Sequence, residues 1–266
     1  MAFFLSYYCF RMFEALNTFL QDYKNADTIA VNIINLSSQE KLIFNEEQKF
    51  YPASFIKLFA AFLAQKKLVD EKDDFIKTDI QDAIKNSLKE SDNDALSLLY
   101  DYVSETSSGS YVAQEYLVFK EKRNLLTNFF QEQGFSEQLK LHNKCFSFAP
   151  YGVDKKLFLD QGSNQVLIND MQKIFFLILD EANGLLQFMQ RDGSCYQSNF
   201  IFQALNKNDI DFFFSKAAWT STVRHDLAYF SYKQEEYLAI FMTKDLSDKE
   251  ELITELASLA FIPNRL

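Results

Sequence analysis

Residues 50–57 have the sequence FYPASFIK, in which an apolar helical run follows a proline. Pro52 cannot continue a strand ladder, so Ser54 is expected where an extended segment gives way to a helix over 55–68. Residues three apart share a helix face, so the Lys57 amine can reach the Ser54 hydroxyl. A lysine whose pKa is lowered can take the proton of a serine and make it a nucleophile. This stretch therefore predicts a boundary in the fold and a candidate nucleophile at the same place.

Strands are expected on both sides of this stretch. The segment before it contains two short apolar runs joined by Ser-Ser-Gln-Glu, which is typical of a hairpin. The last quarter of the chain contains three more runs of this kind. The predicted strands cover residues 28–36, 41–45, 210–216, 226–233 and 237–243.

The middle of the chain has the apolar spacing of helices. The predicted helices cover 79–90, 94–104, 109–133, 166–182 and 196–206, with terminal helices over 1–24 and 247–261. Residues 134–165 have no clear periodicity and are rich in Gly and Pro. They are expected to form a long loop, and long loops in compact domains often carry function.

Together these elements predict a mixed α+β fold. One antiparallel five-stranded sheet is expected, flanked by the terminal helices, with an inserted all-helical lobe. The chain is expected to form a single domain over 1–266. Its sheet lobe would come from 1–50 and 207–266, and its helical lobe from about 51–206.

The composition excludes several classes of protein. The 266 residues include only six Gly and three Pro but 29 Phe, which argues against a collagen-like, linker-like or disordered chain and against an all-β fold rich in tight turns. The formal net charge is −10, from 27 basic and 37 acidic residues, which argues against nucleic-acid binding. No apolar run reaches the 18 residues of a membrane span, so none is expected.

The cysteines and histidines do not predict a metal site. Cys9, Cys145 and Cys195 have no metal-ligand spacing, and the two histidines, His142 and His225, are too few for a histidine-based site. Neither a metal nor a cofactor is expected. The apolar start lacks a positive charge before it, so a secretory signal is not indicated and a cytoplasmic location is slightly favoured over a periplasmic or secreted one. The sequence leaves the compartment and the oligomeric state open.

Two further motifs follow in chain order. Ser-Asp-Asn occupies residues 91–93 between two predicted helices, and Lys-Ala-Ala occupies residues 216–218 at the end of a predicted strand. With the Ser-x-x-Lys of residues 54–57, their order and settings resemble the Ser-x-x-Lys, Ser-Asp-Asn and Lys-Thr-Gly set of class A β-lactamases and penicillin-binding proteins. Over about residues 25–262 the chain resembles this superfamily of serine hydrolases.

The resemblance implies a role for each motif. Ser54 would attack a carbonyl and become acylated, with Lys57 as its general base or proton relay. Ser91 would pass a proton to the leaving nitrogen, and Asn93 would hold Lys57 and the substrate amide. Lys216 would supply positive potential near a substrate carboxylate.

The resemblance also implies an oxyanion hole and a pocket wall. The oxyanion would be bound by the backbone N–H groups of Ser54 and Trp219. Tyr151, in the long predicted loop, would wall the pocket, although a simple turn explains it equally well. His225 and Asp226 look like a dyad, but neighbours on a strand point to opposite faces, which favours structural roles for both.

The chain departs from the family pattern in its third motif, in residues 134–169 and in the distance between Ser54 and Ser91. Ala217 lacks the hydroxyl that the family uses on the substrate carboxylate, for which Thr220, Ser221 or Arg224 would have to substitute. Ala218 replaces a glycine, so its methyl group would narrow the site. Residues 134–169 contain no Glu-x-x-Leu-Asn, whose glutamate activates the deacylating water, and Ser91 follows Ser54 by only 37 residues.

The sequence thus predicts a serine hydrolase that forms an acyl-enzyme on an amide or ester carbonyl and deacylates slowly. Its substrate would be a small molecule or peptide, such as a β-lactam or a related peptide. The alternative is a weak or inactive relative that binds a ligand or partner. Lys-Ala-Ala and the missing glutamate motivate this alternative. Each motif also has an interpretation without function, in which Ser54 and Ser91–Asn93 are ordinary helix caps, Lys57 is a solvated lysine and Lys216 is an exposed lysine at a strand end.

Overall fold

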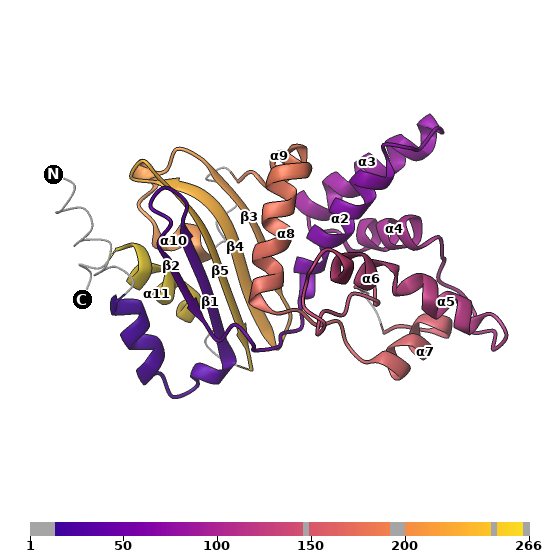
Figure 1. Ribbon diagram of the computed structural model, residues 1–266, viewed down its shortest axis with the longest axis horizontal. Coiled ribbons are helices and arrows are strands. Elements are labelled where there is room, and N and C mark those ends of the chain that lie inside the picture. Colours follow the sequence, from indigo (N-terminus) through magenta and orange to yellow (C-terminus); the bar gives the residue numbers. More distant parts are fainter. Residues whose placement is uncertain (1–13, 146–148, 192–199, 246–248, 263–266) are drawn as a thin grey trace. The chain divides into compact units, whose positions relative to one another are not determined.

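The computed structural model describes residues 14–145, 149–191, 200–245 and 249–262. The chain divides into two compact units (Figure 1). Unit 1 comprises Met1–Phe50 and Gln190–Leu266, so it is built from both ends of the chain. Unit 2 is the continuous segment Tyr51–Met189.

Unit 1 contains a five-stranded sheet in the order β2-β1-β5-β4-β3. Every neighbouring pair of strands is antiparallel, which confirms the predicted sheet. The pairing of β1 with β5 joins residues from opposite ends of the chain, as between Ile29 and Thr243. The strands are β1 Ile29–Asn35, β2 Lys41–Phe44, β3 Phe213–Trp219, β4 Val223–Tyr232 and β5 Glu235–Lys244.

Strand β3 differs from its prediction at both ends. The expected strand over 210–216 begins and ends three residues later, since its ladder with β4 continues as far as the pair of Trp219 and Arg224. The partner strand therefore sets its length, and Lys216 lies inside the strand rather than at its end.

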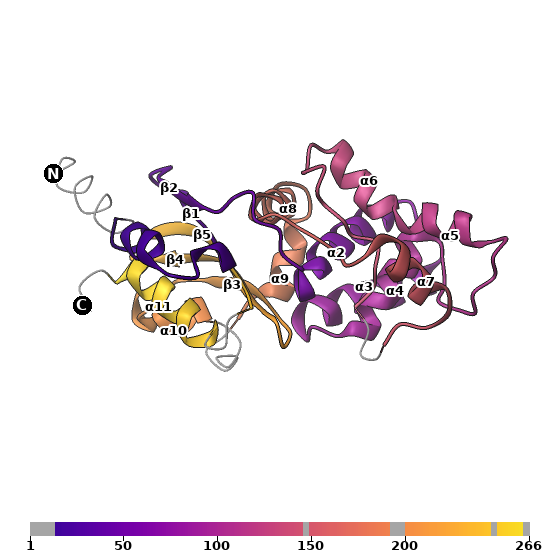
Figure 2. The same ribbon diagram turned by 90° about the horizontal axis from the view of Figure 1, so that it is seen from below.

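Helices cover the sheet of unit 1 and complete its core. Figure 2 shows α10 (Phe200–Ala204) and α11 (Lys249–Phe261) side by side against the sheet. Residues 14–22 are also helical and contribute Leu16 and Leu20 to the same core, so the predicted terminal helices are confirmed there. Residues 1–13 of the first predicted helix and residues 192–199 lie outside the described residues.

Aromatic rings fill the centre of the unit 1 core. The buried Phe230 ring lies 5.4 Å from Phe213, 5.7 Å from Tyr237 and 5.3 Å from Phe261, measured between ring centroids. Such pairs add to the free energy gained by burying apolar area. Part of the large phenylalanine content is therefore core filling.

Unit 2 is built from helices. Its first helix, α2, follows a short 3-10 turn, η2 (Ala53–Phe55), within the stretch 50–57 that contains the Ser-x-x-Lys motif. The helices are α2 Ile56–Lys67, α3 Asp74–Lys89, α4 Asn93–Ser104, α5 Tyr116–Arg123, α6 Leu125–Glu132, α7 Gly152–Gln161, α8 Ile168–Glu181 and α9 Leu186–Met189.

Two predictions for unit 2 need correction. The helix expected over 109–133 is divided into α5 and α6 at Asn124, whose N–H is shared between the carbonyls of Lys120 and Glu121 in a tight turn. The loop expected over 134–165 contains α7, because Val153 and Leu157 lie one helical turn apart and bury against Tyr116 of α5.

Gly152 shows why α7 begins where it does. Its φ is +55°, and a Cβ atom there would lie 1.9 Å from the Gly109 carbonyl oxygen. Only glycine allows this approach. The Val153 N–H donates to the same carbonyl and ties the start of α7 to the loop before α5.

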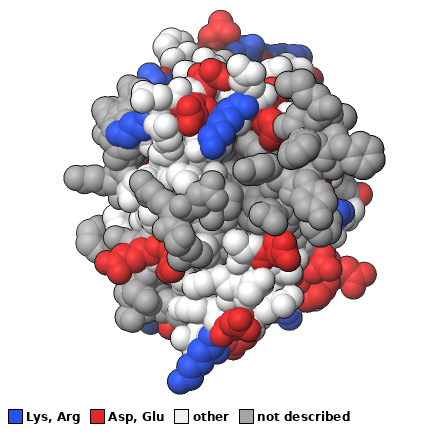
Figure 3. All heavy atoms as spheres, turned by 90° about the vertical axis from the view of Figure 1, so that its left-hand side faces the viewer, with Lys and Arg blue, Asp and Glu red and all other residues white. Residues whose placement is uncertain are grey.

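Two further features of the structure are the length of its helices and the charged side chains on one of its faces. Among the described residues, no helix is long and apolar enough to cross a membrane. On the face of the molecule drawn in Figure 3, the described Lys and Arg side chains lie singly among acidic and uncharged ones.

Candidate active site

The buried side chain of Lys57 lies at the centre of the candidate site in unit 2. Its Nζ atom is 3.0 Å from Ser54 Oγ, 3.2 Å from Ser91 Oγ, 2.7 Å from the Ser91 carbonyl oxygen and 2.8 Å from Asn93 Oδ1. The Ser91 hydroxyl also donates to Ser54 Oγ at 3.0 Å. The structure therefore brings together four of the residues predicted from the sequence.

The start of α2 presents Ser54 and Lys57 to each other. Ser54 lies in η2 and Lys57 in the first turn of α2, so their side chains share one face. Buried Phe55 and Ile56 between them anchor the turn. Ala53, directly before the serine, has a φ of +46°, an uncommon conformation for a residue with a Cβ atom.

In the Ser-Asp-Asn motif, the middle residue caps a helix and the two outer residues contact Lys57. The Asp92 carboxylate accepts from the N–H groups of Asp94 and Ala95 at 2.7 and 3.2 Å and so caps α4. Ser91, with a φ of +58°, and Asn93 lie on either side of this cap and both contact Lys57. The capping interpretation thus holds for Asp92, whereas its two neighbours face the lysine.

Burial controls the charge of Lys57. Desolvation lowers the pKa of its amine from 10.5 to about 8, against the opposing influence of Cys145 and Asp92. A tenth or so of the amine is therefore neutral near pH 7, since one pH unit changes the ratio tenfold. A neutral amine 3.0 Å from a serine hydroxyl can accept its proton.

Cys145 and Tyr51 belong to the same neighbourhood, although sequence reasoning did not place them there. The Cys145 thiol donates to the Ala53 carbonyl oxygen at 3.7 Å. Burial and a hydrogen bond with Cys145 raise the pKa of Tyr51. The one available signal was that Tyr51 lies in the motif stretch and Cys145 in the Gly- and Pro-rich segment.

The other predicted site residues belong to unit 1, except Tyr151. Lys216 is buried and its Nζ donates to the Ala217 carbonyl at 3.2 Å, so the interpretation as an exposed strand-end lysine is wrong. Tyr151 precedes α7 in unit 2, with its side chain 65% exposed.

The β3–β4 hairpin holds three of these residues together. The Arg224 guanidinium lies over the Trp219 ring, 5.1 Å from its centroid, and donates to the Thr220 carbonyl at 2.5 Å. The Thr220 hydroxyl accepts from the N–H groups of Thr222 and Val223 and so stabilises the turn.

The Trp219 N–H points away from β4. Thr220 N–H donates to Val223 across the hairpin, whereas the Phe213 carbonyl accepts from Arg191 on the other side of β3. Backbone groups alternate along a strand, so residues of odd number, Trp219 among them, direct their N–H groups to the outer edge.

His225 and Asp226 have structural contacts, as the strand geometry predicted. His225 is buried and its ring packs edge-on against Phe50 at 5.8 Å. Asp226 Oδ2 accepts from the Ile201 N–H at 2.9 Å, which ties α10 to β4. Burial raises the pKa of the Asp226 carboxyl to about 7.

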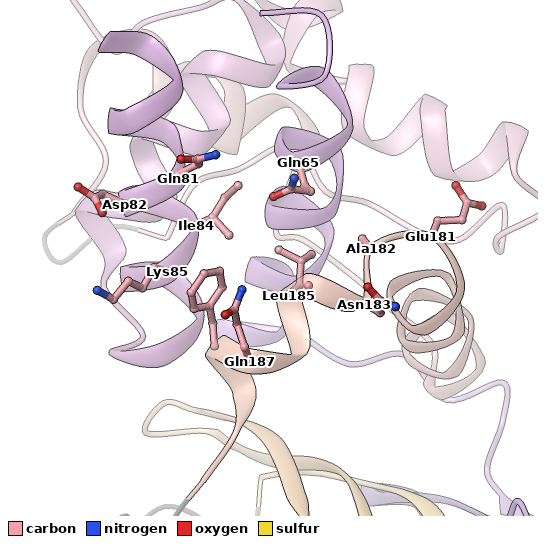
Figure 4. Close-up of a pocket in the computed structure, with 12 residues that line it drawn as sticks. Gln65, Gln81, Asp82, Ile84, Lys85, Glu181, Ala182, Asn183, Leu185 and Gln187 are labelled. Carbon is pink, nitrogen blue, oxygen red and sulfur yellow. The ribbon is translucent and has the colours of Figure 1, made fainter. Parts of the chain in front are cut away.

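Unit 2 also has a hollow that does not involve these residues. It has a volume of about 530 Å³ and lies between α2, α3 and residues 181–188 (Figure 4). Its walls carry mainly amide and charged side chains, such as Gln65, Gln81 and Lys85. Among the described residues, no three His, Cys, Asp or Glu side chains gather as metal ligands would.

Comparison with known proteins gives matches of structure only. Models of protein families give no match, and curated proteins give none either. The β-lactamase from Sphaerobacter thermophilus superimposes with a TM-score of 0.66 at 14% identity, covering 93% of this chain and 96% of that one. The class A β-lactamase from Mycobacterium abscessus gives a TM-score of 0.64 at 12% identity, covering 92% and 96%.

A third solved structure, that of PBP-A, matches to a similar degree. The structure of PBP-A superimposes with a TM-score of 0.63 at 17% identity, covering 93% of this chain and 94% of that chain. At such identities the likeness is one of fold. The chain therefore shares the fold of these β-lactamases and of PBP-A.

Proposed function

We propose that the protein is a serine hydrolase that forms an acyl-enzyme on Ser54, with a β-lactam or a related peptide as substrate. The observation that carries this proposal is the 3.0 Å distance between Lys57 Nζ and Ser54 Oγ, combined with a Lys57 pKa lowered to about 8. The fold shared with β-lactamases and PBP-A supports this class of substrate.

The first step is acylation. Neutral Lys57 takes the proton of the Ser54 hydroxyl as Oγ forms a bond to the substrate carbonyl carbon. The bond from that carbon to the leaving nitrogen then breaks. Ser91 Oγ lies 3.2 Å from Lys57 Nζ and 3.0 Å from Ser54 Oγ, so its hydroxyl can pass the proton from Lys57 to the leaving nitrogen. Asn93 orients the amine through its side-chain oxygen.

The remaining predicted residues are proposed to bind the substrate. Lys216 and Arg224 supply positive charge for a substrate carboxylate, and Tyr151 lines the pocket. The family resemblance assigns the oxyanion to the N–H groups of Ser54 and Trp219, and the direction of the Trp219 N–H away from β4 suits such a role. The hydroxyl of Thr220 is occupied in its own turn, so Arg224 is the better substitute for the hydroxyl missing at Ala217.

Deacylation is proposed to be slow. Residues 134–169 contain no Glu-x-x-Leu-Asn to activate a water. The side chain that this stretch brings to the Ala53 carbonyl is the Cys145 thiol, which acts there as a hydrogen-bond donor. An acyl-enzyme without a positioned base is expected to persist.

The second candidate is a ligand-binding protein with little or no catalysis. Ala218 is the observation that favours it, because this fully buried residue stands where the resembling family has a glycine that admits the substrate. In that case Ser54 would stay unmodified while β-lactams or peptides bind reversibly.

Labelling with a fluorescent penicillin or a fluorophosphonate, read by intact mass, separates the two candidates. The expected result is one adduct, mapped to Ser54 and absent from Ser54→Ala. Folded wild-type protein without an adduct would overturn the enzyme proposal. Rapid turnover of a chromogenic cephalosporin would overturn the claim of slow deacylation.

A further inference from the structure

A cluster of four charged side chains lies inside unit 2, outside the candidate active site. Arg123 of α5 pairs through Nη2 with Asp101 of α4 at 3.0 Å and with Asp154 of α7 at 3.4 Å. Lys144 Nζ pairs with the other oxygen of Asp101 at 2.7 Å. Two positive and two negative charges therefore balance in one ion cluster of Asp101, Arg123, Lys144 and Asp154.

Burying these charges costs desolvation free energy, so the ion cluster is expected to position the segments that it joins rather than to stabilise the fold. The Arg123 side chain is fully buried and that of Lys144 is 2% exposed. Desolvation lowers the pKa of both groups. Arg123 also lies over the rings of Phe119 and Tyr100, at 5.0 and 5.9 Å. Buried pairs seldom add net stability, but they can specify one arrangement of the groups that they join.

Lys144 of this cluster connects it to the residue before the candidate nucleophile Ser54. Lys144 precedes Cys145, whose thiol donates to the Ala53 carbonyl before Ser54. On the other side of Lys144, the Asn143 N–H donates to Asn164 Oδ1 at 2.9 Å, and the Asn143 carbonyl accepts from Asn164 Nδ2 at 2.7 Å. Residues 143–145 are thus fixed on both sides.

We propose that the ion cluster is a positioning device for Ser54. Through Lys144 it holds the Cys145 thiol against the Ala53 carbonyl, and this contact keeps Ala53 in the left-handed conformation that presents Ser54 Oγ to Lys57. The effect on acylation rests on the proposed function, whereas the effect on geometry does not. Cys145 and the four charged residues are positioning residues, since they act through Ala53 rather than on the substrate.

The first test compares Cys145→Ala with Cys145→Ser. Cys145→Ala removes the donor and is expected to lower the acylation rate constant of Ser54 about tenfold to a hundredfold, as small displacements of reacting groups do. Cys145→Ser keeps a donor and is expected to recover most of the rate. Equal rates for the wild type and Cys145→Ala, with the same melting temperature, would overturn the proposal.

The second test weakens the cluster without unbalancing its charge. The double variant Asp101→Asn with Lys144→Met removes one charge of each sign and leaves the pair of Arg123 and Asp154. It is expected to lose acylation rate by a factor similar to that of Cys145→Ala. The matched control is Lys156→Met, which removes a lysine from the surface pair with Asp160 on α7. A folded double variant with the wild-type rate would overturn the role of the cluster, and if it fails to fold the Cys145 variants decide.

An NMR pH titration of isotope-labelled lysine follows the Lys57 amine directly, so it tests the inference even if Ser54 is never acylated. The Lys57 amine is expected to titrate at a shifted pH in the double variant, which keeps Cys145 in place, and at the wild-type pH in Lys156→Met. A Lys57 titration unchanged in the folded double variant would overturn the inference. Absence of any Ser54 adduct in the wild type would instead overturn the proposed function alone.

Discussion

Lys57 Nζ and Ser54 Oγ lie 3.0 Å apart, and the same nitrogen is also in contact with Asn93 and with two oxygens of Ser91. An ammonium group has three protons, so it cannot satisfy all four acceptors at once. A neutral amine has a lone pair to offer the serine. The charge state of Lys57 therefore decides whether the pair acts as an ion-dipole contact or as a nucleophile with its base.

The acylation rate is expected to follow the fraction of neutral Lys57. With its pKa lowered to about 8, the rate constant should fall about tenfold per pH unit below that value and level off above it. Adduct formation at Ser54, followed between pH 5.5 and 10, measures this profile. A rate that does not change between pH 6 and 9 would exclude Lys57 as the base.

Replacing the base should affect acylation far more than folding. Lys57→Met is expected to lower the acylation rate constant by about 10²–10⁴, the usual contribution of a general base. The control on the same helix is Lys66→Met, which breaks a surface pair with Glu181. The control should label at the wild-type rate. If Lys57→Met labels as fast as the control, the assignment is wrong.

Asp226 is expected to make the stability of unit 1 depend on pH. Its folded pKa of about 7 lies above the unfolded value of 3.8, so the folded state binds the proton more tightly. The resulting stability is fully present below about pH 4 and is lost as the pH rises through 7. Asp226→Asn should therefore raise the melting temperature more at pH 8 than at pH 5, by about 5–10 °C.

Trp219, the single tryptophan of the chain, reports on this transition from within unit 1. Its fluorescence can be followed during thermal unfolding at the two pH values. A difference between variant and wild type that is the same at pH 5 and pH 8 would mean that the Asp226 carboxyl does not titrate in this range.

The aromatic core of unit 1 should be sensitive to truncation. Phe230 is fully buried among three other rings, and Phe230→Ala is expected to lower the free energy of unfolding by about 3–5 kcal/mol. Phe75, whose side chain is 84% exposed, gives the matched control, with a change within about 0.5 kcal/mol for Phe75→Ala. Urea unfolding followed by circular dichroism measures both. Similar losses for the two variants would contradict the assigned core.

The sequence predicted most of the sheet because strand signals are local. The runs that became β1 and β2 are mainly apolar, and the turn between them is polar. The position of Lys216 was predicted less well, since the length of β3 depends on its pairing with β4, which lies in another part of the chain.

The helical spacing predicted the contact of Ser54 with Lys57, and the family resemblance implied that Ser91 and Asn93 act beside them. Ser54 and Lys57 meet because residues three apart lie on the same face of a helix. Ser91 and Asn93 flank Asp92, which caps the start of α4, and both contact Lys57. Cys145 could not be predicted in the same way. Its contact with the Ala53 carbonyl depends on tertiary structure, and the segment around it has no periodic pattern.

The pairing of β1 with β5 has a consequence for biosynthesis. On a ribosome, Ile29 emerges long before its partner Thr243, by about 10–40 s at typical elongation rates. Unit 2 is continuous, so its helices can form during that interval. Strand β1 can pair early with β2, which follows it directly in the chain, but its other edge must wait for β5. The nascent chain therefore exposes that edge of a mainly apolar strand for most of its synthesis, which makes the edge a natural binding segment for a chaperone.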